Sequence, residues 1–112
     1  MRSKEPEQPQ VASFVTSDAG AGRILRVIGE VDISTTPSFK NALDSALSGY
    51  SGDLTLDLTD VEFMDSSGLH ALMETTRQVI SRGGSMRLRN PGHTVYRLLE
   101  ISGLLGYFHI TS

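Results

Sequence analysis

Residues 56–72 read Leu-Asp-Leu-Thr-Asp-Val-Glu-Phe-Met-Asp-Ser-Ser-Gly-Leu-His-Ala-Leu and indicate a strand, a turn and the start of a helix. We expect a buried strand over 54–58, where leucines alternate with polar residues. Beyond the turn, residues at helical spacing predict one buried stripe, formed by Leu69, Leu72, Met73, Thr76, Val79 and Ile80. A serine at such a helix start suits a phosphorylation switch, because free N–H groups and the helix dipole favour an anion there.

Strands and helices alternate on both sides of this stretch. Further strands are expected at 14–16, 23–31, 86–89 and 107–110. The first helix should have Thr36 as its N-cap, Pro37 as its first residue and Gly49 just beyond its end. A third helix is expected over 93–102, with apolar residues at Val95, Leu98, Leu99 and Ile101. This order predicts a two-layer α/β fold, with a mixed, mostly parallel sheet of about five strands, an antiparallel edge and helices mainly on one face.

The length of 112 residues corresponds to one domain. Residues 1–11 are mostly polar, contain two prolines and are expected to be a disordered tail, so the folded domain should span 12–112. No apolar run approaches the roughly 18 residues of a membrane span, and the first ten residues lack the apolar core of a secretory signal. We therefore expect no membrane insertion and a cytoplasmic protein.

The net charge of −3 is unevenly distributed. Residues 1–70 hold 11 acidic and 5 basic residues, whereas residues 71–112 hold 2 acidic residues and 5 arginines. The acidic half contains the Asp-Ser-Ser sequence, so a partner that binds there should be basic. The arginines are spread over several elements without interleaved aromatic residues, which argues against a nucleic-acid partner.

No catalytic or metal-binding pattern is present. Ser66 lies between Met64 and Gly68, so it lacks the Gly-x-Ser-x-Gly sequence of a hydrolase nucleophile. No orienting acid accompanies the three scattered histidines, His70, His93 and His109. No cysteine, metal-ligand spacing or phosphate-binding glycine loop occurs. We expect no enzyme activity, no cofactor and no metal.

The residues of the turn each have a plausible structural role. Phe63 and Met64 should hold the turn to the core, and Asp65 or Ser66 should cap the helix. Gly68 allows close backbone approach and leaves little bulk above the site. Serine pairs at helix starts most often serve as caps, so capping is the alternative to a phosphorylation site.

His70 follows Ser66 by one helical turn and has two interpretations. It could contact a phosphate on Ser66, or it could simply face solvent, which is usual for histidine.

Several segments in order resemble the STAS-domain anti-sigma factor antagonists, and the resemblance spans residues 23–110. They are Gly-Glu-Val-Asp at 29–32, Leu-Asp-Leu at 56–58, Met-Asp-Ser-Ser-Gly-Leu at 64–69, Gly-Gly at 83–84 and Ile-Ser-Gly-Leu at 101–104. The resemblance implies the STAS fold, with Ser66 as phosphoacceptor and Ser67 as the fallback. It implies a partner-binding site formed by Asp32, Asp65, Ser66, Ser67, Gly68 and Leu69.

The resemblance also implies the partners. An anti-sigma factor with GHKL-type serine kinase activity would bind the unphosphorylated chain and release a sigma factor, and a metal-dependent serine phosphatase would reverse the phosphorylation. STAS domains also serve as accessory subunits of lipid-transport ATPases, as cytoplasmic tails of anion transporters and as parts of stress-signalling assemblies. A non-switching interaction module of one of these kinds is therefore the alternative.

Overall fold

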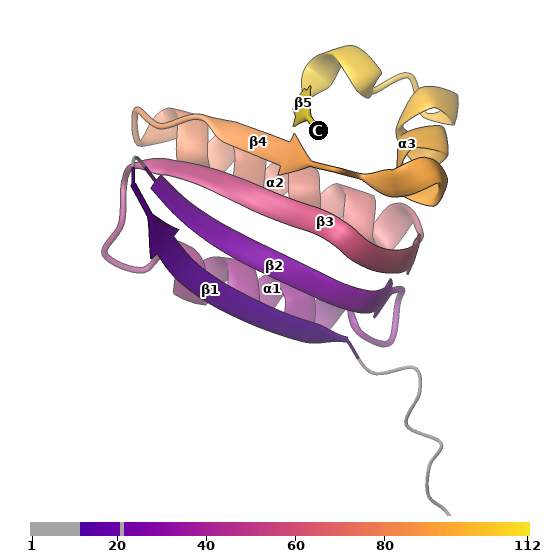
Figure 1. Cartoon of the computed structure of the whole chain (residues 1–112), viewed down its shortest axis with the longest axis horizontal. Coiled ribbons are helices and arrows are strands. Elements are labelled where there is room, and N and C mark those ends of the chain that lie inside the picture. Colours follow the sequence, from indigo (N-terminus) through magenta and orange to yellow (C-terminus); the bar gives the residue numbers. More distant parts are fainter. Residues whose placement is uncertain (1–11, 21) are drawn as a thin grey trace, which may run out of the picture.

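The computed structural model describes residues 12–20 and 22–112, which form one sheet with helices packed along it (Figure 1). The predicted tail at 1–11 lies outside the described residues. In chain order the elements are β1 (Ser13–Ala19), β2 (Gly22–Val31), α1 (Thr36–Leu47), β3 (Asp53–Met64), α2 (Ser66–Ser81), β4 (Met86–Arg89), α3 (Gly92–Ile101), the 3-10 helix η2 (Leu105–Tyr107) and β5 (His109–Thr111).

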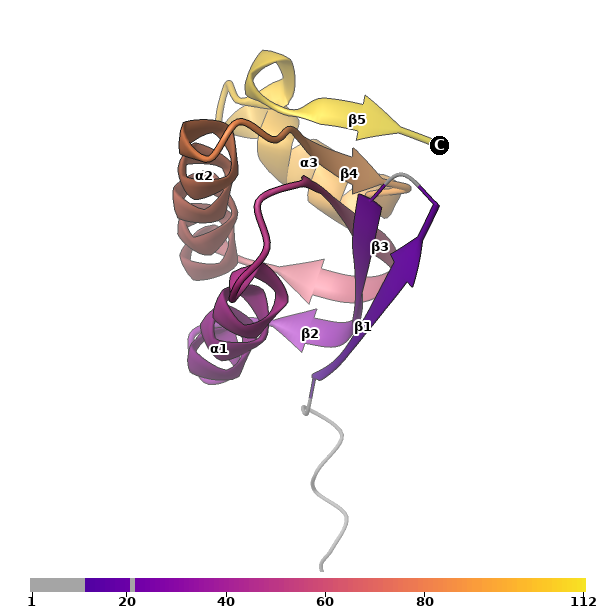
Figure 2. The same ribbon diagram turned by 90° about the vertical axis from the view of Figure 1, so that its left-hand side faces the viewer.

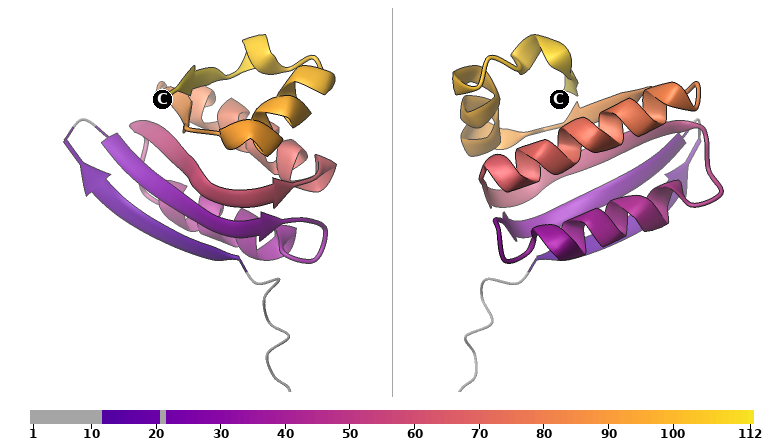
Figure 3. Two further views of the ribbon diagram at one scale, coloured as in Figure 1. Left: turned by 45° about the vertical axis from the view of Figure 1, so that its right-hand side comes forward. Right: turned by 180° about the vertical axis from the view of Figure 1, so that it is seen from behind.

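The sheet has the order β1-β2-β3-β4-β5. β1 pairs antiparallel with β2, and the remaining neighbours pair in parallel. α1 and α2 lie side by side against one face of the sheet, as Figure 2 and the right-hand view of Figure 3 show. α3 contacts β3 and η2 at the end of the sheet toward which β3 and β4 run (Figure 1). The predicted two-layer, mostly parallel architecture with an antiparallel edge is confirmed.

The core lies between the sheet and the two long helices. The three leucines of the predicted strand, at 54, 56 and 58, are all 0% exposed. The helices cover them with a largely aliphatic layer that includes Phe39, Leu43, Leu69, Leu72 and Val79. The prediction that Ile80 belongs to the buried stripe is wrong, and Ile101 of the third helix is exposed as well. Both lie in the last turns of their helices, where they are 60% and 72% exposed.

β3 extends well beyond the predicted 54–58 and reaches Met64. The pairing with β2 shifts register twice, once between Arg26 and Ile28 and again between Gly29 and Glu30. Such irregularities interrupt the two-residue alternation of buried side chains, which is the signal that sequence reasoning uses to recognise a strand. Gly29 has φ of 101° at the second shift, a conformation that favours glycine.

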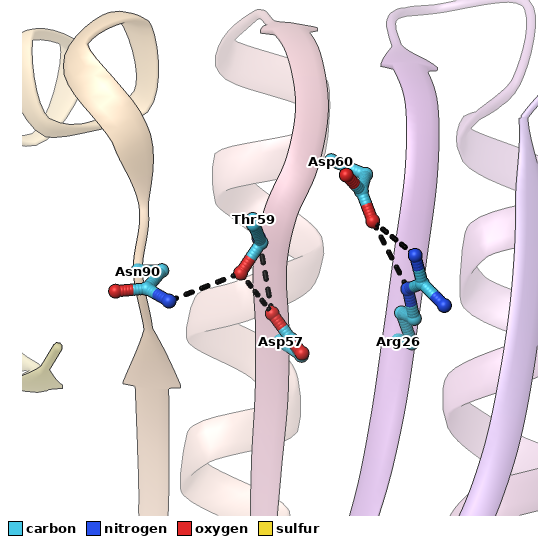
Figure 4. Close-up of polar contacts among 5 residues, drawn as sticks. All are labelled: Arg26, Asp57, Thr59, Asp60 and Asn90. Atoms are coloured by element: carbon cyan, nitrogen blue, oxygen red, sulfur yellow. Dashed lines mark hydrogen bonds and ion pairs between the residues drawn. The ribbon is translucent and has the colours of Figure 1, made fainter.

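Polar contacts link the strands on the sheet face that α1 and α2 leave uncovered (Figure 4). Arg26 donates from Nε and Nη2 to Asp60 Oδ2 at 3.0 and 2.5 Å. Thr59 donates its hydroxyl proton to Asp57 Oδ1 at 2.6 Å, and Asn90 Nδ2 donates to Thr59 Oγ1 at 3.2 Å. These contacts join β2, β3 and the residue after β4 beside the register shifts.

We predict that Gly29→Ala lowers the free energy of unfolding by about 1–3 kcal/mol, because a Cβ is strained at this backbone conformation. Gly106→Ala is the control, since the space around its Cβ position holds no atom within 4 Å. It should change stability by less than about 0.5 kcal/mol. Urea unfolding of the three proteins measures both effects, and equal stability of the two variants would contradict the role given to Gly29.

Candidate functional site

Two chain connections at one end of the sheet form the candidate site. The loop 32–35 joins β2 to α1, and Asp65 joins β3 to α2. Val31 pairs with Met64 at the ends of the two strands, and the Asp65 amide donates to the Val31 carbonyl at 3.1 Å. The structure therefore brings Asp32 beside the Asp-Ser-Ser sequence, although 33 positions separate Asp32 from Asp65 in the chain.

Asp65 is the N-cap of α2, which decides between the two caps that the sequence leaves open. Its backbone is extended, with φ of −110° and ψ of −171°, and its Oδ1 accepts from the Ser67 amide at 2.9 Å. The carboxylate thus satisfies one of the amides that a helix start leaves unpaired. An incoming anion would meet a negative charge already in place at this helix end.

The two serines differ in their surroundings. Ser67 is half-buried, and its hydroxyl donates to Asp65 Oδ1 at 2.5 Å and lies 2.9 Å from Thr36 Oγ1. Ser66, the first residue of α2, is exposed, and its hydroxyl forms no hydrogen bond to any of residues 12–20 and 22–112. The Ser66 hydroxyl is therefore accessible to a reagent, whereas the Ser67 hydroxyl has a structural role.

Thr36 ties the start of α1 to the start of α2. Its side chain is buried, and Oγ1 donates to the Asp32 carbonyl at 2.7 Å as well as contacting Ser67. The Thr36 and Ser67 hydroxyl oxygens lie within hydrogen-bond distance of each other, so the contact links the two helix starts directly. The prediction that Thr36 is the N-cap of α1 is wrong by one residue, because Thr35 holds that position. The neighbouring sequence does not indicate that Thr36 contacts Ser67, because the two residues lie 31 positions apart in the chain.

Asp32 organises the first turn of α1. Its Oδ1 accepts from the Ser34 amide at 2.9 Å, the Ser34 hydroxyl at 2.7 Å and the Thr35 amide at 3.1 Å. The hydrogen bond from the Ser34 hydroxyl is the largest influence and lowers the pKa of Asp32, and the amide bonds add to it against the opposing effect of desolvation. Asp32 is thus held as a carboxylate beside the start of α2.

Gly68 lies where α2 comes closest to the sheet. A Cβ on this residue would lie 2.7 Å from Val31 Cγ1 and 2.9 Å from Met64 Cγ. The glycine is therefore explained by packing beneath the helix, and not by space above the site. Leu69 is only 5% exposed and supports the helix from the same side.

The expectation that Phe63 and Met64 both hold the turn to the core is wrong for Phe63, which is 43% exposed. Met64 is 3% exposed, and of the two it alone reaches the core.

Acidic residues and one exposed apolar residue occur on the chain segments that lead into α1 and α2. Glu30, Asp32, Glu62 and Asp65 lie on the two strand ends and loops, and Ile33 in the loop is 80% exposed. Sequence reasoning passed over Ile33 because a single apolar residue in a loop is an ordinary pattern. His70, further along α2, is exposed to solvent.

No group of three or more His, Cys, Asp or Glu in the described part of the chain is placed to hold a metal ion. Over the same residues, no helix is both long enough and apolar enough to span a membrane.

Comparisons with known proteins concern the family and the fold. The family model of the STAS domain matches residues 14–112. An anti-sigma-B factor antagonist of Bacillus subtilis (strain 168) is 33% identical over 88 residues, which cover 79% of this chain and 80% of that protein. The crystal structure of an anti-sigma factor antagonist from Mycobacterium paratuberculosis superposes with a TM-score of 0.82 at 25% identity, covering 92% of this chain and 87% of the other.

Two further solved structures are of SpoIIAA, one in each phosphorylation state. The anti-sigma factor antagonist SpoIIAA in its unphosphorylated form gives a TM-score of 0.73 at 21% identity, with 89% of each chain covered. Bacillus SpoIIAA in the phosphorylated form gives 0.69 at 22% identity, covering 89% of this chain and 91% of that one. At these identities the likeness concerns the fold, and both states share it with this chain.

We predict that the Asp32 carboxylate contributes to stability at neutral pH and that this contribution is lost in acid. Its pKa is lowered in the folded protein, so the contribution is complete above the ordinary carboxyl range and disappears as the pH falls through the folded value. Ser34→Ala should raise the pKa of Asp32 toward its usual value and move acid unfolding to higher pH. Carboxyl ¹³C NMR titration measures the pKa, with the exposed Ser38→Ala as control. An unchanged Asp32 titration in Ser34→Ala would contradict this assignment.

We also predict that Ser67→Ala lowers the free energy of unfolding by about 1–2 kcal/mol, because it removes a hydrogen bond to a carboxylate. Ser66→Ala should change stability by less than about 0.5 kcal/mol, since its hydroxyl is exposed. The pair is matched in chemistry and differs only in position. Thermal or urea unfolding makes the comparison, and a greater loss for Ser66→Ala would reverse the roles of the two serines.

Proposed function

Because this chain belongs to the STAS domain family, we propose that it is an anti-sigma factor antagonist whose binding to its partner is switched off by phosphorylation of Ser66. The observation that carries the proposal is the exposed Ser66 hydroxyl, which lies at the start of α2 next to a serine already committed to the structure. The sequence relationship to named antagonists supports the class of partner.

A phosphate on Ser66 would act mainly through charge. It adds about −1.5 to −2 at neutral pH. The helix dipole would favour it by only about 0.3–1 kcal/mol at an exposed end, and the Asp65 carboxylate already accepts from the Ser67 amide. Repulsion from neighbouring carboxylates and the cost of desolvating the phosphate in an interface oppose docking. A loss of about 2.8 kcal/mol suffices for a hundredfold drop in affinity.

The switch requires little refolding. Asp65 already caps α2 in the unmodified protein and accepts from the Ser67 amide. A phosphate on Ser66 would therefore not replace it as the cap, and the loop would have no reason to change its conformation. The likeness of this chain to both forms of SpoIIAA supports the same view, because one fold accommodates each state. Phosphorylation would then block docking directly.

The chemistry of the switch would belong to the partners. We propose that the anti-sigma factor carries GHKL-type serine kinase activity and supplies the nucleotide, and that a metal-dependent serine phosphatase removes the phosphate. The chain itself would act by binding, without catalysis. It would work in the cytoplasm, where sigma factors function. The acidic surface beside Ser66 favours a basic partner surface.

We predict that one GHKL-type kinase from the same genome phosphorylates this chain on Ser66 in the presence of ATP and Mg²⁺. Phosphate should be located by mass spectrometry on Ser66 in the wild type and in Ser67→Ala, and should be absent from Ser66→Ala. Ser66→Ala should still bind that kinase, whereas Ser66→Asp should bind at least about tenfold more weakly. Backbone amide shifts should change only around the start of α2.

Phosphate on Ser67 in the wild type would move the switch to the fallback residue. Equal binding by Ser66→Ala and Ser66→Asp would contradict the charge mechanism. Absence of phosphate with every candidate, together with a stable complex with an ATPase subunit, would support the alternative of a non-switching accessory module.

A further inference from the structure

The strand β1 forms one edge of the sheet, and its outer side has no partner strand among the described residues (Figure 1). β1 pairs with β2 over all seven of its residues, Ser13–Ala19, without a register shift. An edge strand directs about half of its main-chain N–H and C=O groups away from its one neighbour. Apart from the pairing with β2, no main-chain hydrogen bond joins β1 to another described residue. This edge is therefore free to accept a further strand.

β1 lacks the devices that usually prevent pairing at an edge. Natural proteins protect exposed edges with lysine, proline, bulges or very short strands. The sequence Ser-Phe-Val-Thr-Ser-Asp-Ala contains neither lysine nor proline. Its one charged side chain, Asp18, forms an ion pair of 2.8 Å with Arg23 of β2. The opposite edge of the sheet differs, because β5 has only three residues, His109–Thr111.

The helix beside this edge also leaves room for a neighbour. α1 contacts β1 and β2. Lys40 and Asp44 line the groove between α1 and α2, so the helical repeat places Ser38, Ala42 and Ser45 on the other side of α1. These three side chains are small and uncharged. A second molecule approaching the edge would therefore meet no charged side chain from this side of α1.

Two apolar side chains of β1 would gain cover from an added strand. The Phe14 ring stacks on the Phe39 ring with 5.7 Å between centroids, so Phe14 faces the helices. Val15 lies on the opposite face, because side chains alternate along a strand, and it is 53% exposed. Phe14 is itself only partly buried. A neighbouring strand would cover apolar surface on both faces of the sheet.

We propose that β1 pairs antiparallel with β1 of a second copy of this chain, which joins the two five-stranded sheets into one. Full overlap of the two strands places the two-fold axis at Thr16. Thr16 then faces Thr16 of the second copy, and Val15 and Phe14 face Ser17 and Asp18. Cross-strand threonine pairs are favourable, and no like charges oppose each other in this register.

The symmetry of this contact explains why the partner is a second copy. An antiparallel pair of identical strands is related by a two-fold axis, so the assembly closes as a dimer. Pairing of β1 with β5 of another copy would be open-ended and would join only three residues. β2 and its counterpart run in opposite directions in the dimer, so the two Asp-Ser-Ser segments lie at opposite ends. The inference therefore does not depend on the proposed function.

The size of the contact predicts a weak dimer. Seven residues of strand span roughly 23 Å. A contact of this length across the sheet and one helix layer buries on the order of 800–1,000 Å² in total, below the range of about 1,200–2,000 Å² that is typical of stable complexes. The dimer should therefore form at high protein concentration and dissociate on dilution.

The test measures the mass of the full chain by sedimentation equilibrium at concentrations from about 10 μM to about 1 mM, the range expected of a weak interface. The wild-type mass should rise from that of one chain toward that of two. Thr16→Lys and Thr16→Glu should each weaken self-association at least about tenfold, because like charges then meet at the two-fold axis. Thr94→Lys is the matched control on an exposed threonine of α3 and should stay within about twofold of the wild type.

An equimolar mixture of Thr16→Lys and Thr16→Glu provides the decisive measurement. The mixture should dimerise although neither variant does so alone, because opposite charges then face each other at the axis. Recovery also shows that both variants retain a folded β1.

Three results would overturn the inference. They are a wild-type chain that stays monomeric at about 1 mM, self-association that Thr16→Lys leaves unchanged, and a mixture of the two charge variants that remains monomeric. Self-association that continues beyond the mass of two chains would also contradict it, because the two-fold contact closes.

Discussion

The close contact between Gly68 and the cross-strand pair of Val31 and Met64 is the constraint on which the site depends. It seats the first turn of α2 directly above the point where β2 and β3 end together. Any side chain at this glycine would push the helix away from the sheet, because steric overlap in a closely packed interior is destabilising. With the helix start fixed, Asp65 must cap it, and the two serines that follow take defined directions.

Adjacent residues on a helix point about 100° apart, which follows from 3.6 residues per turn. One serine of the pair therefore faces α1 while the other faces outward. Ser67 contacts Asp65 and Thr36, and Ser66 leaves its hydroxyl in solvent. Two residues of the same chemistry therefore have different surroundings, and their positions along the helix decide which of them is exposed.

Much of the fold follows from short-range patterns in the sequence. β4 has the predicted bounds, and α1 and α3 start and end within a residue or two of the expected positions, because caps, glycines and apolar spacing act locally. The full length of β3 was not predicted from the sequence. Its register shifts interrupt the alternation of buried and exposed side chains on which the prediction relied. The contact between Thr36 and Ser67 and the exposure of Phe63 were not predicted for a related reason. Both depend on which residues from distant parts of the chain lie next to them in the folded protein.

The candidate site joins residues 32–36 to residues 65–67, which are distant in the chain and come together only when β2 pairs with β3. The Asp-Ser-Ser-Gly-Leu sequence excised as a peptide would lack the loop around Asp32 and the contact between Thr36 and Ser67. If the proposed function holds, an enzyme acting on this site would meet a folded surface that a linear peptide does not reproduce. Nascent, damaged or unfolded copies would escape both modification and partner binding, so the signal would count only molecules able to respond to it.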